Sequence, residues 1–162
     1  MNSPISMPGS RLVPRQPTHP IDSVRFMSEI DWDALRDEAA RARDHAYAPY
    51  SQHPVGAAAL TDDGRIVSGC NVENASIGTT LCAECGLVSE LLKTSEPGNR
   101  SRLVAFACVG PNPGPLLPCG RCRQLLWEHG GPNLLIDRAG GPTPLSVLLP
   151  DGFGPEDLPG HR

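Results

Sequence analysis

The chain has 162 residues, a length that fits one domain with a buried core. No apolar run reaches the roughly 18 residues that a membrane-spanning helix needs, so we expect no contact with a membrane. The formal charge is −4 at pH 7, and because residues 1–26 carry a net +2, the rest of the chain carries −6. An acidic domain without clusters of Lys and Arg is a poor nucleic-acid binder and favours a small, uncharged partner.

The first segment, residues 1–26, holds five prolines and shows no hydrophobic period. We interpret it as a disordered N-terminal lead or as a segment added by engineering, since Leu12-Val13-Pro14-Arg15 resembles an engineered protease site. The segment also lacks the apolar block of a signal peptide, so we expect a cytoplasmic protein whose six cysteines stay reduced. The folded domain is expected over residues 27–162.

The first elements of the domain are predicted as a helix and a hairpin. Apolar residues recur at helical spacing over residues 31–46, with Asp31 as the N-cap and Pro49 ending the helix. Residues 55–60 and 66–72 have the composition of strands, and the turn between them contains Gly64, which can take a positive φ.

The second half of the chain alternates helices with strands. Periodicity predicts helices over residues 82–94, 119–129 and 145–149, and buried strands over residues 103–109 and 134–137. Such alternation indicates an α/β protein in which helices cover a sheet. Cys70 and Cys108 lie in the apolar strands and are expected to be buried packing residues.

Two short cysteine pairs carry the chemistry of the sequence. They are Cys82-Ala83-Glu84-Cys85 and Cys119-Gly120-Arg121-Cys122. Spacing alone is that of a structural zinc site closed by four thiolates. Two features favour a catalytic site instead. Both pairs open a predicted helix, where the N-terminal dipole stabilises thiolate, and Glu84 lies within the first pair, where a closed site has no use for an acid.

These pairs and several other segments resemble the small zinc-dependent cytidine deaminases. The wider deaminase class carries a His- or Cys-x-Glu motif followed by Pro-Cys-x-x-Cys, matched here by Cys82-Ala83-Glu84 and by Pro118–Cys122. Further matches are the segments at residues 48–51, 55–58, 70–76 and 148–153. Together the matches cover nearly all of residues 31–158, in family order.

The resemblance implies a three-layer α-β-α sandwich around a mixed, roughly five-stranded sheet, assembled as a homotetramer with sites shared between subunits. It implies one Zn²⁺ per subunit, held by Cys82, Cys119 and Cys122 with Cys85 left out, and Glu84 as the catalytic acid and base. For the substrate it implies that Asn71 and Glu73 bind the ribose, that the Ala83 backbone and the residue at 53 contact the base, and that Phe153 stacks on the base of a neighbouring subunit.

The expected reaction is the hydrolytic deamination of cytidine and 2′-deoxycytidine, a step of pyrimidine salvage. A zinc-bound water has its pKa lowered from ~15.7 toward roughly 7, and Glu84 would move its proton to N3 of the base and then to the leaving ammonia. A carboxylate at Glu73 accepts hydrogen bonds from sugar hydroxyls but repels a phosphate, which favours nucleosides over nucleotides.

Four positions depart from the family pattern. His53 stands where relatives usually carry Phe, Ile77 where they carry Tyr, Thr79 where they carry Leu, and Cys85 where many carry Arg. We therefore expect an altered or weaker nucleoside preference. Arg121, Arg123 and the helix N-termini remain as candidates to offset the charge of three thiolates.

Two other functions are consistent with parts of the pattern. The same chemistry would serve a related substrate such as an aminated nucleoside antibiotic. A non-catalytic zinc module that binds proteins would instead use all four cysteines Cys82, Cys85, Cys119 and Cys122 as ligands.

Overall fold

The computed structural model of the chain describes residues 30–160, so the expected lead at residues 1–26 lies outside the described part. Five strands form one sheet in the order β2-β1-β3-β4-β5, with β3 and β4 parallel and the other neighbouring pairs antiparallel. In chain order the strands are β1 (Gly56–Thr61), β2 (Ile66–Cys70), β3 (Leu103–Val109), β4 (Leu135–Ile136) and β5 (Thr143–Pro144). The mixed five-stranded sheet is the one expected.

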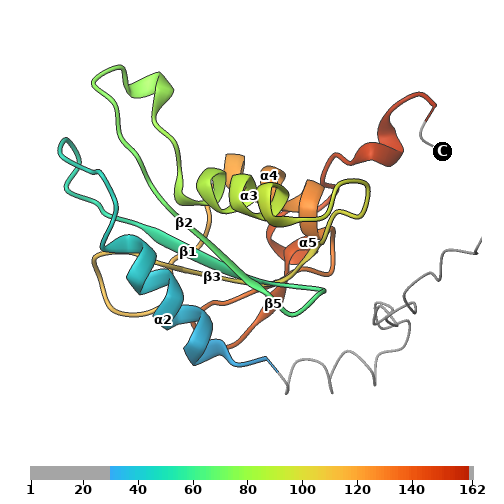
Figure 1. Cartoon of the computed structure of the whole chain (residues 1–162), viewed down its shortest axis with the longest axis horizontal. Coiled ribbons are helices and arrows are strands. Elements are labelled where there is room, and N and C mark those ends of the chain that lie inside the picture. The colour runs from blue at the N-terminus through green and yellow to red at the C-terminus, as the bar shows by residue number, and fades with distance from the viewer. Residues whose placement is uncertain (1–29, 161–162) are drawn as a thin grey trace, which may run out of the picture.

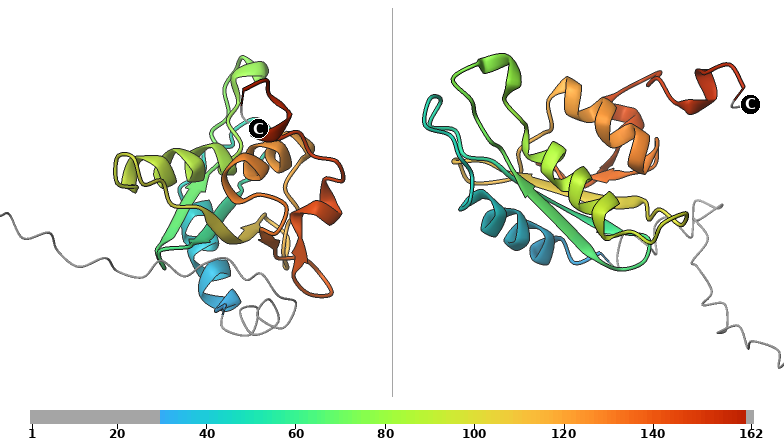
Figure 2. Two further views of the ribbon diagram at one scale, coloured as in Figure 1. Left: turned by 90° about the vertical axis from the view of Figure 1, so that its right-hand side faces the viewer. Right: turned by 45° about the horizontal axis from the view of Figure 1, so that its top comes forward.

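The helices lie on both faces of this sheet. They are α2 (Trp32–Arg43), α3 (Ala83–Thr94), α4 (Gly120–Gly130) and the single turn α5 (Leu145–Leu148), with 3₁₀ turns at Ile77–Thr79 and Pro155–Asp157. Helix α2 covers one face, and α3, α4 and α5 cover the other (Figures 1 and 2). The three-layer α-β-α sandwich is confirmed. No helix within residues 30–160 has the length and apolarity to cross a membrane.

The two core layers follow from the alternation of side chains along the strands. In β3, Phe106 and Cys108 face the layer of α3 and α4, whereas Ala105 and Ala107 face α2. In β1, Ala58 likewise lies in the α2 layer. Small side chains on the α2 side allow that helix to lie close to the sheet.

Two glycines allow the closest approaches between helix and strand. A Cβ on Gly69 of β2 would collide with the backbone of α3, including the Ala83 carbonyl oxygen at 2.5 Å and the Gly86 carbonyl carbon at 2.8 Å. On the opposite face, a Cβ on Gly56 of β1 would collide with the backbone of α2, with the Arg43 Cα at 2.9 Å. The start of α3 is therefore seated directly on β2.

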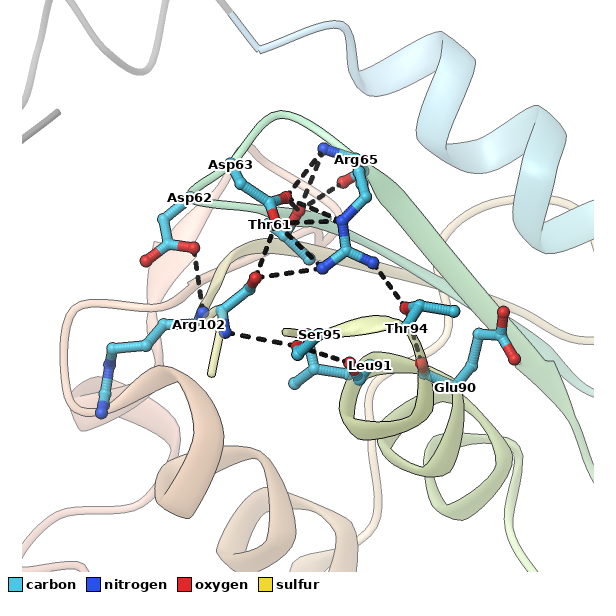
Figure 3. A network of polar contacts seen from close by, with 10 residues as sticks. Thr61, Asp62, Asp63, Arg65, Glu90, Leu91, Thr94, Ser95 and Arg102 are labelled. Atoms are coloured by element: carbon cyan, nitrogen blue, oxygen red, sulfur yellow. Dashed lines mark hydrogen bonds and ion pairs between the residues drawn. The ribbon is translucent and has the colours of Figure 1, made fainter. Parts of the chain in front are cut away.

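The hairpin between β1 and β2 is fastened to the far end of α3 (Figure 3). Asp63 accepts hydrogen bonds from Thr61, Ser101 (2.6 Å) and Arg65 (2.9 Å). Arg65 in turn donates to the Thr94 hydroxyl in the last turn of α3. Gly64 takes the expected positive φ of 84° in the turn.

Three local expectations differ from the structure. Helix α2 ends at Arg43 and not at residue 46, because the N–H groups of His45 and Ala46 bond to carbonyls three residues back and the chain then turns extended at Tyr47. Strand β2 ends at Cys70, since the next residues pair outside the sheet. Cys108 is buried as expected, but Cys70 is only half-buried because it lies at the end of the edge strand β2.

Candidate active site

Two helix N-termini meet at the site, and a cysteine precedes each helix. Cys82 is the N-cap of α3 and Cys119 is the N-cap of α4, both with extended backbone. Neither side chain makes the capping hydrogen bond that Ser, Thr, Asp or Asn would make there. Neither sulfur atom is therefore used to cap its helix, and both are available as metal ligands.

The sulfur atoms of Cys82, Cys119 and Cys122 lie within 4.8 Å of one another, the one such group of potential metal ligands within residues 30–160. Cys122 is in the first turn of α4, so the two N-terminal turns supply all three sulfurs. Zn–S bonds of about 2.3 Å place tetrahedral sulfur ligands about 3.8 Å apart, a spacing that falls inside the 4.8 Å limit of this cluster. Cys119 is exposed, Cys82 half-buried and Cys122 buried, so the cluster opens to the surface on one side.

Burial disfavours the ionisation of two of the three thiols, whereas hydrogen bonds favour the ionisation of the third. Burial, together with nearby thiols and Glu84, raises the pKa of Cys82 and of Cys122. Burial also raises the pKa of Cys119, but hydrogen bonds from the Cys122 backbone N–H and from neighbouring thiols outweigh it, and the net pKa is lowered. A divalent cation at the centre would favour all three thiolates, because it attracts each negative charge. The donor set fits zinc.

Cys85 does not belong to the cluster, although it is only one helical turn from Cys82. Its sulfur accepts a hydrogen bond from Arg121 Nη2 at 3.4 Å. The group of converging ligands thus contains three sulfurs and not four. A zinc ion held by three protein ligands keeps a position for water, as catalytic zinc sites do.

Glu84 is placed beside the three sulfurs. It lies in the first turn of α3, only 4% exposed, and Cys122 Sγ donates to its Oε2 at 3.1 Å. No ion pair within residues 30–160 involves Glu84. A buried carboxylate without a cationic partner, next to a metal-ligand cluster, can accept and return a proton.

Asn71 and Glu73 lie on the segment that follows β2 and hold the preceding loop in place. Asn71 accepts from the Val55 N–H at 2.8 Å and donates to the His53 carbonyl at 3.0 Å. Glu73 Oε2 accepts a hydrogen bond from the Tyr50 N–H at 2.8 Å and a longer one from the Ser51 N–H at 3.2 Å. The side-chain hydrogen bond from Ser51 is the main reason that the pKa of Glu73 is lowered.

The remaining expected site residues are less tightly held. His53 is exposed, and its ring lies beside Gly110. Its Nε2 is 3.6 Å from the position that a Cβ on Gly110 would take. Ala83 is buried at the first position of α3, where the backbone N–H has no intrahelical partner. Phe153 is 55% exposed on the C-terminal segment, which is tied to α4 by a hydrogen bond from Gln124 to the Phe153 carbonyl.

A pairing that the sequence did not predict connects the substrate segment to the metal cluster. Val72 and Leu81 exchange both backbone hydrogen bonds at 2.9 Å, so that residues 73–80 form a closed loop immediately before Cys82. Tyr47 joins the other side of this pairing through Asn71 and Glu73. The apolar alternation at residues 70, 72 and 81 is too short to have signalled it.

Comparison with known proteins gives consistent matches. The family model for the cytidine and deoxycytidylate deaminase zinc-binding region matches residues 31–136. A cytidine deaminase of Mycobacterium tuberculosis (strain ATCC 25618 / H37Rv) is 55% identical over 136 residues, covering 84% of this chain and 99% of that protein. The crystal structure of cytidine deaminase from Mycobacterium tuberculosis has a TM-score of 0.72 at 56% identity, covering 78% and 99% of the two chains. The one from Burkholderia pseudomallei has a TM-score of 0.65 at 44% identity, covering 76% and 100%.

Proposed function

This chain belongs to the family of zinc-dependent cytidine deaminases, and we propose that it hydrolyses cytidine and 2′-deoxycytidine to uridine and 2′-deoxyuridine with release of ammonia. It is a hydrolase that acts on the C–N bond of a cyclic amidine. The observation that carries the proposal is the convergence of three cysteine sulfurs beside a buried carboxylate, with the fourth nearby cysteine turned to an arginine.

The chemistry needs a nucleophile and a mobile proton. Zinc held by Cys82, Cys119 and Cys122, one ion per subunit, would supply the Lewis acidity that makes water nucleophilic near neutral pH. Glu84 takes the proton of the attacking water and gives it to N3 of the cytosine ring as a new C4–O bond forms. A proton returned through Glu84 to the exocyclic nitrogen then lets ammonia leave as the C4–N bond breaks. Water is added and ammonia is released, so the reaction balances.

The loop held by Asn71 and Glu73 fits a ribose. In this proposal one oxygen of Glu73 keeps the loop at residues 50–51, and the carboxylate also accepts a hydrogen bond from a sugar hydroxyl. Because its lowered pKa keeps Glu73 negative at working pH, a 5′-phosphate nearby would be repelled. Nucleosides are therefore the substrates and nucleotides are excluded.

The base is bound by residues from two copies of the chain. The Ala83 N–H at the start of α3 donates to the ring, and His53 contacts the base from the loop held by Asn71. Phe153, exposed on the C-terminal segment, would stack on a base held mainly by a second copy. These roles follow the positions that the residues occupy in the family motif.

A homotetramer would complete these shared sites. Support comes from the apolar patch formed by Tyr47, Val72, Ile77 and Leu81, which are 54%, 44%, 83% and 47% exposed. Patches of this kind mark contact surfaces. The six free cysteines favour the reducing cytoplasm, and a cytidine deaminase there serves pyrimidine salvage.

The direct test incubates the purified full-length protein with cytidine, 2′-deoxycytidine and cytidine 5′-monophosphate and follows the fall in ultraviolet absorbance. We expect turnover of both nucleosides, little turnover of the nucleotide, and loss of activity after a chelator removes zinc. An aminated nucleoside analogue preferred over cytidine would contradict the assigned substrate. Zinc bound without turnover of any amine would contradict the assigned activity.

A further inference from the structure

Phe153 is exposed although the backbone on both sides of it is held. Its side chain is 55% exposed, whereas the next residue, Gly154, is buried. On the other side, Gly152 lies so close to Trp127 of α4 that a Cβ there would be 2.8–2.9 Å from three atoms of the indole ring. An exposed aromatic side chain on a fixed backbone has less freedom to lose when it contacts another molecule, which favours binding.

Three side chains of α4 hold this C-terminal segment. Arg123 donates to the Leu148 carbonyl at 2.9 Å, and Gln124 donates to the Phe153 carbonyl at 2.8 Å. Trp127 follows at helical spacing on the same side of α4, and it is half-buried against the core cluster of that layer. Together the three side chains hold the segment near both of its ends.

The contact between Trp127 and Gly152 depends on the flat ring and on the missing side chain. The indole atoms nearest the glycine are Cδ2, Cε2 and Cε3, which include the bond shared by the two rings, so Gly152 lies over the ring face. Asp151, just before it, has a positive φ of 53° and marks a sharp bend in the chain. Because the indole packs on the core, a side chain at position 152 would displace the segment.

We propose that Trp127 is a positioning residue, whose indole supports Gly152 and thereby holds Phe153 where it contacts the base bound by a second copy. The inference rests on the proposed function, because the base belongs to the substrate assigned there. Since Trp127 acts through Phe153, it affects substrate binding and not the chemical step. Helix α4 also begins with the cluster residues Cys119 and Cys122, so its first turn serves the site of its own copy and its later turns serve that of a second copy.

The first test measures kcat and KM for cytidine with the full-length enzyme. In Gly152→Ala the new Cβ meets the indole, so we expect KM to rise about 2–10-fold, the size of an aromatic contact, with kcat near the wild-type value. Trp127→Leu removes the support and should raise KM within the same range. Two controls should keep the wild-type KM: Gly86→Ala adds a methyl at an ordinary contact on α3, and Trp32→Leu shortens an indole on α2.

Two double variants show whether the effect passes through this contact and through Phe153. The shorter leucine side chain makes room for the added methyl, so Trp127→Leu combined with Gly152→Ala should have a lower KM than either single variant. Residues in contact deviate from additivity in this way, whereas the effects of independent sites add. In the Phe153→Ala protein, whose KM is already raised, Gly152→Ala should cause no further rise.

Hydrogen exchange reports the state of the segment without turnover. In the zinc-loaded full-length enzyme, the peptide spanning residues 149–158 should exchange about 2–10-fold faster in Trp127→Leu and in Gly152→Ala than in wild type. The double variant should exchange at close to the wild-type rate, because the contact is re-formed by a smaller ring-free side chain and a larger residue at position 152.

KM effects that simply add in the first double variant, a further rise of KM in the Phe153→Ala protein, or unchanged exchange in both single variants would each overturn the inference. If Gly152→Ala does not fold, Trp127→Leu decides by the same measurements, alone and combined with Phe153→Ala. A wild-type enzyme that turns over no cytidine would contradict the proposed function. Exchange would then decide whether Trp127 positions Phe153, since faster exchange in the single variants supports that role and unchanged exchange excludes it.

Discussion

Glu84 differs from the other polar residues that the described part of the chain buries. Asp137, 1% exposed, is paired with Arg36 at 2.7 Å, and Thr61 is bonded to the hairpin turn. Glu84 is also buried, at 4% exposed, but the hydrogen bond that its side chain makes within residues 30–160 comes from the thiol of Cys122. Burying a carboxylate is unfavourable unless it is paired, so its presence here is explained by chemistry and not by stability.

Replacing that carboxylate should separate metal binding from turnover. We expect Glu84→Gln to keep zinc and lose about 10²–10⁴ in kcat, the usual contribution of general acid–base catalysis. Zinc content by atomic absorption and initial rates on cytidine measure the two effects. Glu90→Gln, on the same helix but paired with Lys93 at 2.6 Å, is the control. A glutamine variant with near wild-type kcat would remove Glu84 from the mechanism.

His53 is expected at the base site and stands where the family pattern has Phe. If it contacts the base, a larger and less hydrated ring should bind better, because aromatic contacts contribute about 0.5–1.5 kcal/mol. We expect His53→Phe to lower KM for cytidine by about two- to tenfold with little change in kcat. His45→Phe, an exposed histidine just after α2, should change neither constant. An unchanged KM in His53→Phe would place this residue outside the base site.

At the scale of elements, the contact between β2 and α3 fixes the position of the first turn of α3. Gly69 touches the backbone of α3 at Ala83 and Gly86, so the strand and the helix start are in direct contact. A displacement of α3 would move Glu84 and Cys82 away from the two cysteines of α4. Gly69 therefore positions Glu84 and Cys82 without touching either side chain's reactive atoms through a side chain of its own.

A methyl group added on the two sides of this contact should affect stability differently. In Gly69→Ala the new Cβ meets backbone, which cannot give way, so we expect a loss of about 1–3 kcal/mol in unfolding free energy and weaker zinc binding. In Gly86→Ala the nearest atom is the Gly69 Cα at 3.5 Å, an ordinary contact, so this variant should be tolerated. Urea titrations with zinc present measure both. Equal stability of the two variants would contradict the close contact.

The hairpin network at the other end of α3 makes stability depend on pH (Figure 3). Burial raises the pKa of Asp63, but hydrogen bonds from Arg65, Ser101 and Thr61 outweigh it and hold the pKa well below its ordinary value. The stabilisation is therefore present above the unfolded-state pKa of about 4 and is lost as the pH falls through the lower folded value.

Asp63→Asn should remove part of this acid sensitivity. Because the Asp63 side chain is 43% exposed, solvent screening limits the effect to on the order of 1 kcal/mol. We expect the variant to be less stable than wild type at pH 7 and the difference to narrow below about pH 4. Asp37→Asn, at an exposed site on α2, should leave the pH profile unchanged. A difference that stays constant with pH would show that the carboxylate charge is not involved.

At the scale of the whole molecule, apolar residues gather at the end of the sandwich that carries the site. Tyr47, Val72 and Leu81 are neighbours in the backbone pairing there, and Ile77 lies at the tip of the loop that this pairing closes. Leu81 directly precedes the cluster residue Cys82, so a second copy that covered the patch would lie next to the three sulfurs.

Ile77→Lys tests whether a second copy does so. A charge at a contact residue costs about 2 kcal/mol or more of binding, so we expect a smaller species in size-exclusion chromatography with light scattering, and reduced activity. Ile66→Lys introduces the same charge at a residue that is 44% exposed at the hairpin end of β2, and should keep the assembly. A tetramer that survives Ile77→Lys would move the contact elsewhere.

Much of this architecture was predictable because its signals are local. The N-cap at Asp31, the glycine turn at Gly64 and the apolar run of β3 depend on neighbouring residues, and each lies where the pattern indicated. Contacts between distant residues were not predictable. The contact of Cys85 with Arg121, 36 residues away, is an example, because no periodicity reports it.

The Val72–Leu81 pairing has a consequence for sequence variation in the loop that it closes. Because two reciprocal hydrogen bonds join the two ends of the segment, we expect changes of length within residues 74–80 to leave Cys82 in place. Glu73 and Ile77 both lie inside that segment. Changes within this segment are therefore expected to alter substrate and subunit contacts more than the positions of the three sulfurs.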